Sequence, residues 1–211
     1  MGVVIDLREH RARRAGAPAA GRPAPVRVAF AFEAGSPWTY LAAERVERRF
    51  AGVRWQPVAG AALGLEPRPA RGAIERRAGE LGLPLVWPEG GVATGPGVAR
   101  AAAMAAAHGC GAGFVLAAGR LAYCGGYDLD DPDVLAEAAA AGGFDPATAL
   151  EAACDPAHDR PLLDAAARLS RRGATGLPLL QVGRRLFCGE RAITGATVLP
   201  LRVDAPRRDA L

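Results

Sequence analysis

Two hydroxyl side chains, Ser36 and Thr39, stand three residues apart in the stretch AGSPWTYLAAE, residues 34–44. A short apolar run precedes this stretch and an amphipathic one follows it, which predicts a strand, a tight turn and a helix start. The N–H groups and dipole at a helix N-terminus favour negative charge, so hydroxyls there could help to hold an anion. Ser36 as N-cap and Pro37 at the first helical position would equally make a good helix start without function. The residue types alone leave both interpretations open.

The cysteines do not offer an alternative chemistry. Cys110, Cys124, Cys154 and Cys188 form no CxxC pair and lack the spacing of metal ligands. His108 stands close to Cys110, but no second pair of ligands accompanies them, so no metal site is expected. We expect reduced thiols in a cytoplasmic protein.

Composition and charge argue against several other classes of protein. The 26 basic residues are all Arg, and Lys and Asn do not occur, a bias typical of a GC-rich genome. The net charge is only +4, and much of it lies in REHRARR near the start and PRRD near the end, so no nucleic-acid partner is expected. No apolar run of about 18 residues and no secretory signal occur, so no membrane association is expected either.

The order of expected elements describes one sheet interrupted by helices. Residues 26–34 and 53–58 predict strands on either side of the helix that begins at Ser36. Residues 60–172 have a helical pattern, and β character returns in GLPLLQVGRRLFCGE, which predicts a hairpin with its turn at Gly183-Arg184. A strand–helix–strand unit and a terminal hairpin are expected to share one sheet, which makes the helical block an insertion.

In this order the chain resembles the DsbA-like proteins, and among them the branch of 2-hydroxychromene-2-carboxylate isomerases and kappa-class glutathione transferases. The stretches that carry the resemblance are SPWTYLAAERVE, ERRAGELGLPLVWPE, YDLDDPDVLAEAAAAGGFD and RRGATGLPLLQVGRRLFCGER. The resemblance implies an α/β thioredoxin-like fold with an all-helical insertion between the βαβ unit and the C-terminal β-hairpin. The expected divisions are a disordered basic tail at 1–24, a thioredoxin-like domain at 25–59 and 173–200, a helical insertion domain at 60–172 and a flexible tail at 201–211.

The same resemblance gives the Ser-x-x-Thr spacing a chemical meaning. In the redox members of the family two cysteines occupy these positions, so their replacement by Ser36 and Thr39 argues against a dithiol-disulfide oxidoreductase. In the resembling enzymes the anion at the helix end is the thiolate of bound glutathione, and a serine hydroxyl that bonds to the thiolate lowers its pKa. The resemblance therefore implies an isomerase or transferase in which Ser36 is catalytic. The cofactor would be glutathione or another low-molecular-weight thiol, and the partner an electrophilic aromatic or unsaturated small molecule.

Two further stretches are implied to bind the thiol. Leu177-Pro178 stands where thioredoxin folds typically have a cis X-Pro bond, which would expose the backbone of Leu177 to a peptide-like ligand. An ordinary trans proline opening an edge strand is the alternative. Glu190 and Arg191 stand where the branch has Gly-x-Asp-Arg, so they would bind the ammonium group and a carboxylate of the ligand. A solvated surface pair is the alternative.

A second hypothesis is a catalytically degenerate DsbA-like binding or scaffold protein without thiol chemistry. The branch often has Lys and Asn after the second strand and at the entry of the insertion. This sequence lacks both residues, and AITGATVLPLRVDAP replaces the helix usually expected after GER. Either the last helix is very short or part of the ligand wall is lost. The resemblance leaves a homodimer open. The side chains expected in a substrate pocket are Trp38, Thr39 and Trp87, and core packing accounts for the two tryptophans equally well.

Overall fold

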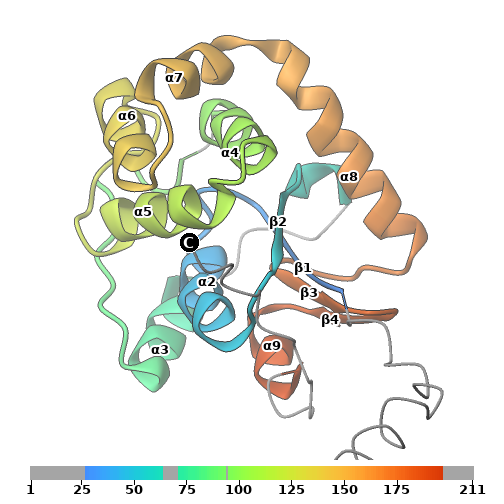
Figure 1. Ribbon diagram of the computed structural model, residues 1–211. Coiled ribbons are helices and arrows are strands. Elements are labelled where there is room, and N and C mark those ends of the chain that lie inside the picture. Colours follow the sequence, from blue (N-terminus) through green and yellow to red (C-terminus); the bar gives the residue numbers. More distant parts are fainter. Residues whose placement is uncertain (1–26, 64–70, 94, 197–211) are drawn as a thin grey trace, which may run out of the picture.

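One four-stranded sheet organises the part of the chain that the computed structural model describes, residues 27–63, 71–93 and 95–196 (Figure 1). The strands lie in the order β2-β1-β3-β4. β2 is parallel to β1, whereas β3 is antiparallel to both β1 and β4. Their bounds are Val28–Phe32 for β1, Arg54–Pro57 for β2, Leu179–Val182 for β3 and Arg185–Cys188 for β4. The predicted hairpin and the predicted βαβ unit therefore share one sheet, and the α/β thioredoxin-like fold is confirmed.

The two faces of β1 pack against different helices because side chains alternate along a strand. All five residues of β1 are buried. Phe30 and Phe32 belong to a core shared with α2 (Pro37–Arg49), whereas Ala31 packs against α8 (Asp159–Arg171). Each large apolar side chain buried in this way stabilises the fold by about 1.5–3 kcal/mol. The sheet is thus fixed from both sides, and the ends of its strands are fixed with it.

The helical insertion is built around α4 (Gly97–Ala107), α5 (Gly111–Tyr123), α6 (Pro132–Ala141) and α7 (Pro146–Cys154). α5 packs along α2 and α4 contacts β2, while α6 and α7 lie outside them (Figure 1). Their many alanines and glycines allow close approach, since a Cβ added to Gly113 would overlap the backbone of Gly142. Short 3₁₀ turns occur at Gly60–Leu63 and Pro156–His158.

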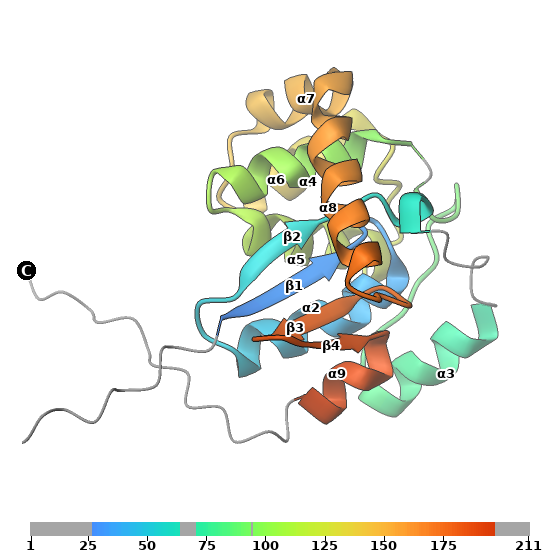
Figure 2. The same ribbon diagram turned by 90° about the vertical axis from the view of Figure 1, so that its right-hand side faces the viewer.

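The other helices of the 60–172 segment lie against the thioredoxin-like part. α8 covers one face of the sheet, and α3 (Arg71–Leu81) lies beside α2 and near α9 (Glu190–Ala196), as Figure 2 shows. α9 covers the last seven described residues, and the rest of AITGATVLPLRVDAP lies outside the described residues, so both alternatives for the chain end stay predictions. The predicted tails, residues 1–24 and 201–211, lie outside the described residues. Among the described helices, none is long and apolar enough to cross a membrane.

Candidate functional site

The register of the strands brings three of the predicted site stretches to one edge of the sheet. Ala31, next to the last residue of β1, pairs with Leu179, the first residue of β3, and Leu179 also pairs with Cys188, the last residue of β4. The turn that follows β1, the residues that precede β3 and those that follow β4 must therefore meet. The N–H of Gly189 donates to the carbonyl oxygen of Pro178 at 2.9 Å, which joins two of these segments directly. Ser36, Leu177-Pro178 and Glu190-Arg191 belong to this edge, the end of the sheet to which β1 points in Figure 2.

Three hydrogen bonds fix the turn that leads into Ser36. The Ser36 N–H and the Thr39 hydroxyl both donate to the carbonyl oxygen of Glu33, at 3.2 and 2.9 Å. The hydroxyl of buried Tyr123 donates to the carbonyl oxygen of Gly35, whose φ of +81° is a conformation that glycine adopts without strain. Thr39 is only 2% exposed and its hydroxyl is already bonded. The geometry does not support the expected role of Thr39 in a substrate pocket, because its side chain holds the turn from inside.

Ser36 occupies the N-cap of α2 without acting as a side-chain cap. Its backbone is extended, with φ −74° and ψ 132°, and its side chain makes no capping hydrogen bond. Pro37 has no N–H group, and within the described residues the N–H groups of Trp38 and Thr39 donate no hydrogen bond. The first turn of α2 carries no acidic residue that would neutralise this end. Ser36, a partly exposed residue, and two backbone N–H donors thus lie together at the positive end of the helix dipole.

Leu177-Pro178 directly precedes β3, at the edge of the sheet where β1 ends. The peptide bond between these two residues is cis in the structure, and Pro178 is buried. The side chain of Leu177 is partly buried and packs with the residues under α8. The segment therefore belongs to the edge where β1 ends and β3 begins.

Trp87 is connected to Ser36 through a chain of packed groups. Its indole N–H donates to the Glu75 carboxylate at 2.9 Å, and the guanidinium carbon of Arg71 lies 4.8 Å from the centre of its ring. Its ring packs edge-on against Tyr123 with 6.2 Å between centroids, and Tyr123 in turn holds the turn before Ser36. Both Trp87 and Trp38 are partly buried and pack against the core. Both tryptophans therefore pack against the core. The parts of their side chains that stay exposed are available for contact with a ligand.

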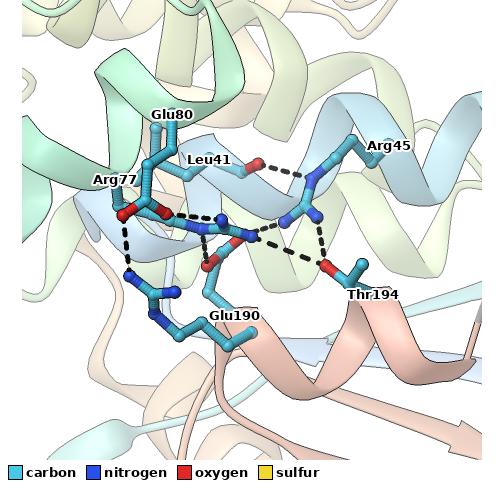
Figure 3. Close-up of polar contacts among 7 residues, drawn as sticks. Leu41, Arg45, Arg77, Glu80, Glu190 and Thr194 are labelled. Atoms are coloured by element: carbon cyan, nitrogen blue, oxygen red, sulfur yellow. Dashed lines mark hydrogen bonds and ion pairs between the residues drawn. The ribbon is translucent and has the colours of Figure 1, made fainter.

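Glu190 is buried in an ion network formed by side chains of the protein itself. Its side chain is 1% exposed, and its two oxygens accept hydrogen bonds from Arg77 at 2.6 and 3.0 Å and a further one from Arg45 (Figure 3). The hydroxyl of Thr194 accepts from the Nη1 of Arg45 at 2.9 Å. This geometry does not support the expectation that Glu190 binds the ammonium group of a thiol, because its carboxylate is already satisfied by two guanidinium groups.

Arg191 lies at the exposed margin of the same network. It contacts Glu80 at 3.1 Å and is 68% exposed, and Glu80 also contacts Arg77 at 2.8 Å. The hydrogen bonds from Arg77 and Arg191 lower the pKa of Glu80. Burial lowers the pKa of Arg45 and the adjacent Glu190 opposes that change. The role of Arg45 in this network was not predicted from the sequence, although Arg45 follows Leu41 by one helical turn and so lies near the buried side of α2.

The described residues of the first turn of α2 do not include a cysteine, although the Sγ of Cys124 lies 3.3 Å from the hydroxyl of Tyr40 in that turn. All four cysteines are free, and Cys188 packs with the residues under α8, on the face of the sheet opposite α2. Within the described ranges, no group of three or more His, Cys, Asp or Glu side chains is placed to hold a metal. A hollow of about 360 Å³ lies elsewhere, and its lining includes Leu116, Arg120 and Ala141 but no predicted site residue.

These features together define a thioredoxin-like protein of the DsbA type. The sheet is mixed, a helix starts directly after its first strand, a proline precedes the antiparallel strand β3, and helices are inserted between β2 and β3. A family model described as the DSBA-like thioredoxin domain matches residues 27–201. The chain belongs to this family, which confirms the resemblance seen in the sequence.

Solved structures support the same fold. A 2-hydroxychromene-2-carboxylate isomerase has a TM-score of 0.63 and 19% identity, and the match covers 80% of this chain and 91% of that one. A probable DsbA oxidoreductase from Streptomyces coelicolor gives 0.60 and 18%, covering 82% and 88%. The cytosolic disulfide reductase DsbM from Pseudomonas aeruginosa, solved with GSH, gives 0.56 and 22%, covering 76% and 87%. At these identities the likeness shows the fold alone. No curated protein matches the chain.

Proposed function

We propose that the protein is an enzyme that uses glutathione or another low-molecular-weight thiol to isomerise or conjugate an electrophilic aromatic or unsaturated compound. The observation that carries the proposal is the state of Ser36. Its hydroxyl stands at the N-terminus of α2, partly exposed and unused as a cap, beside the N–H groups of Trp38 and Thr39. A serine whose purpose was to cap α2 would bond to those N–H groups itself.

The chemistry requires an external sulfur. A serine hydroxyl does not ionise near neutral pH, so Ser36 acts as a hydrogen-bond donor and the bound thiol supplies the nucleophile. When the thiol loses its proton to solvent, the Ser36 hydroxyl and the helix end stabilise the thiolate and lower its pKa. Each pKa unit corresponds to about 1.36 kcal/mol in favour of the ionised form.

The thiolate then adds to an electrophilic carbon, forming a C–S bond while the electron pair of the attacked double bond moves onto the substrate. In an isomerase a single bond created by this addition rotates, and the C–S bond breaks to return the thiolate. In a transferase the C–S bond remains and the substrate takes up a proton. Backbone N–H donors at the helix end would stabilise the negative charge on the sulfur before it adds to the substrate and after the C–S bond breaks.

The other groups of the site would orient the ligand. The backbone of Leu177 before Pro178 would pair with a peptide-like thiol, and exposed Arg191 would contact a carboxylate. Trp87, with Arg71 against its ring, and Trp38 would contact an aromatic substrate. The isomerase among the structural neighbours and the GSH bound to DsbM support a thiol-dependent reaction. A cytoplasmic location, where reduced thiols are abundant, belongs to the same proposal.

One observation favours the second candidate, a binding or scaffold protein of the same fold without turnover. The carboxylate expected to hold the ligand's ammonium group is buried among arginines of the protein itself. A protein that does not bind a small thiol would retain the N-terminus of α2 and the edge of the sheet as structural features only.

The experiment is a thermal-shift titration of the protein with a panel of small thiols that includes glutathione. A ligand at about 100 times its Kd stabilises the folded state by about 2.7 kcal/mol, which gives a measurable shift of Tm. We expect one thiol to raise Tm, Ser36→Ala to reduce that shift, and the matched control Ser170→Ala, on the exposed side of α8, to leave it unchanged. No shift with any thiol at millimolar concentration would favour the scaffold protein.

A further inference from the structure

We infer that Glu190 is a positioning residue, which fixes α3 through Arg77 and thereby holds Trp87 in place against the turn before Ser36. The inference rests on the proposed function in so far as Trp87 is taken to face the ligand. It differs from the ligand contact that the sequence predicted for Glu190, because the carboxylate acts on other side chains of the protein.

Glu190 joins three helices at one point. It begins α9, and its carboxylate binds Arg77 of α3 through two parallel hydrogen bonds and Arg45 of α2 through another (Figure 3). The side chain of Arg77 is 12% exposed and that of Arg45 is 25% exposed, so the pairs are largely shielded from water. Two-point contacts of this kind fix the orientation of the guanidinium group as well as its distance. α9 also contributes the hydroxyl of Thr194 to both arginines.

Few apolar side chains hold α3. Only Ile74 and Ala78 among its eleven residues are buried, and Leu81 packs partly buried against the core, whereas seven residues of α2 are buried. Because α3 has so few apolar contacts, the bonds from Arg77 to Glu190 contribute substantially to its position. The reach of a glutamate suits this task, because one carboxylate on α9 must meet arginines on two other helices.

α3 connects the contact between Arg77 and Glu190 to the candidate site at Ser36 through Trp87. Arg71 and Glu75 lie on its first turns, about 9 Å and 3 Å along the helix axis from Arg77, and both hold Trp87. Trp87 packs on Tyr123, and the hydroxyl of Tyr123 donates to Gly35 directly before Ser36. Glu190 thus anchors α3 at Arg77, and the half of the helix before Arg77 holds Trp87 through Arg71 and Glu75.

Removal of the negative charge should displace α3. Without the carboxylate, Arg45 and Arg77 would be two shielded cations that share no counter-ion, so they would separate. Glu80 cannot replace Glu190, because it lies 45% exposed on the outer side of Arg77. It therefore offers a matched control: Glu80→Gln removes an equal charge and an Arg77 contact but leaves the buried pair intact.

The test compares Glu190→Gln with Glu80→Gln in the full-length protein, with two readouts. The first is the affinity for glutathione, measured by calorimetry. The second is the emission of Trp87 in a Trp38→Phe, Trp55→Phe background. We expect Glu190→Gln to weaken glutathione binding by roughly 3- to 30-fold and to shift the emission of Trp87 to longer wavelength. Glu80→Gln, which retains the buried pair of Arg77 and Glu190, should leave the emission of Trp87 unchanged.

Each outcome separates this inference from the proposed function. Lower stability of Glu190→Gln with unchanged Trp87 emission and unchanged affinity would overturn the positioning role. If glutathione does not bind the unmodified protein, the proposed use of that thiol fails, and the emission of Trp87 alone decides whether Glu190 positions α3. If Glu190→Gln does not fold, Arg77→Lys retains the charge but loses the two-point contact, and it should give the same changes more weakly.

Discussion

Replacement of Ser36 by cysteine would test the proposed anion site without any knowledge of its ligand. The new thiol would take the place of the hydroxyl at the N-terminus of α2, where the N–H groups of Trp38 and Thr39 have no partner among the described residues. In partly buried geometry a helix end stabilises a charge by up to about 2 kcal/mol. Since one pKa unit is about 1.36 kcal/mol, the pKa of the Ser36→Cys thiol should fall by about 1.5 units, from about 8.5 to about 7.

The assay is the pH dependence of alkylation by iodoacetamide, because only the thiolate reacts. A second thiol, Ala107→Cys, lies exposed in the last turn of α4, where the dipole has the opposite sign, and should retain a pKa of about 8.5 or higher. A pKa at or above the ordinary value for Ser36→Cys would refute the argument that this helix end activates a thiol. The background must first lose the native cysteines, which are Cys110, Cys124, Cys154 and Cys188.

Two further predictions concern the fold that holds the site. Gly113→Ala should lower the free energy of unfolding by about 1–3 kcal/mol in urea titrations, because the added methyl overlaps Gly142, whereas Gly79→Ala on open α3 should raise it by about 0.5–1 kcal/mol. Equal effects of the two would contradict the close packing of α5 and α6. Hydrogen bonds from Thr148 lower the pKa of Asp145, so this cap stabilises the fold above the ordinary value of 3.8 and loses its effect as pH falls below it. Asp145→Ala should therefore lower Tm at neutral pH and have little effect in strong acid, as scanning calorimetry at both conditions would show.

The strands and the helix start could be predicted from the sequence because their signals are local. The apolar run before Ser36 and the Ser-Pro pair define β1 and the start of α2 within a few residues. The placement of Ser36 and Leu177-Pro178 at one edge of the sheet needed only one further step, the pairing of the hairpin with β1. Local patterns together with one assumption about topology therefore gave the layout of the candidate site.

The partners of individual side chains could not be predicted in the same way. Glu190 stands 113 positions from Arg77 and 145 from Arg45, and no local pattern shows that three helices will cross at this carboxylate. Thr39 shows the same limit on a smaller scale. Its spacing from Ser36 suggested a shared site, but Ser36 lies just outside α2 with an extended backbone, and the hydroxyl of Thr39 donates back to the carbonyl oxygen of Glu33.

The exchange of two cysteines for Ser36 and Thr39 changes what the rest of the fold must do. In a dithiol protein the sulfur is attached to the helix end, so its position is fixed covalently. In this chain the sulfur would arrive with a ligand, and its position would depend on the walls that orient that ligand. The aromatic wall at Trp87 is held by α3, which has few buried apolar side chains and depends on Arg77 and Glu190. Without a cysteine at the helix end, part of the task of alignment would pass from a covalent bond to the buried ion network that joins α2, α3 and α9, which is why a change at Glu190 should affect binding at Ser36.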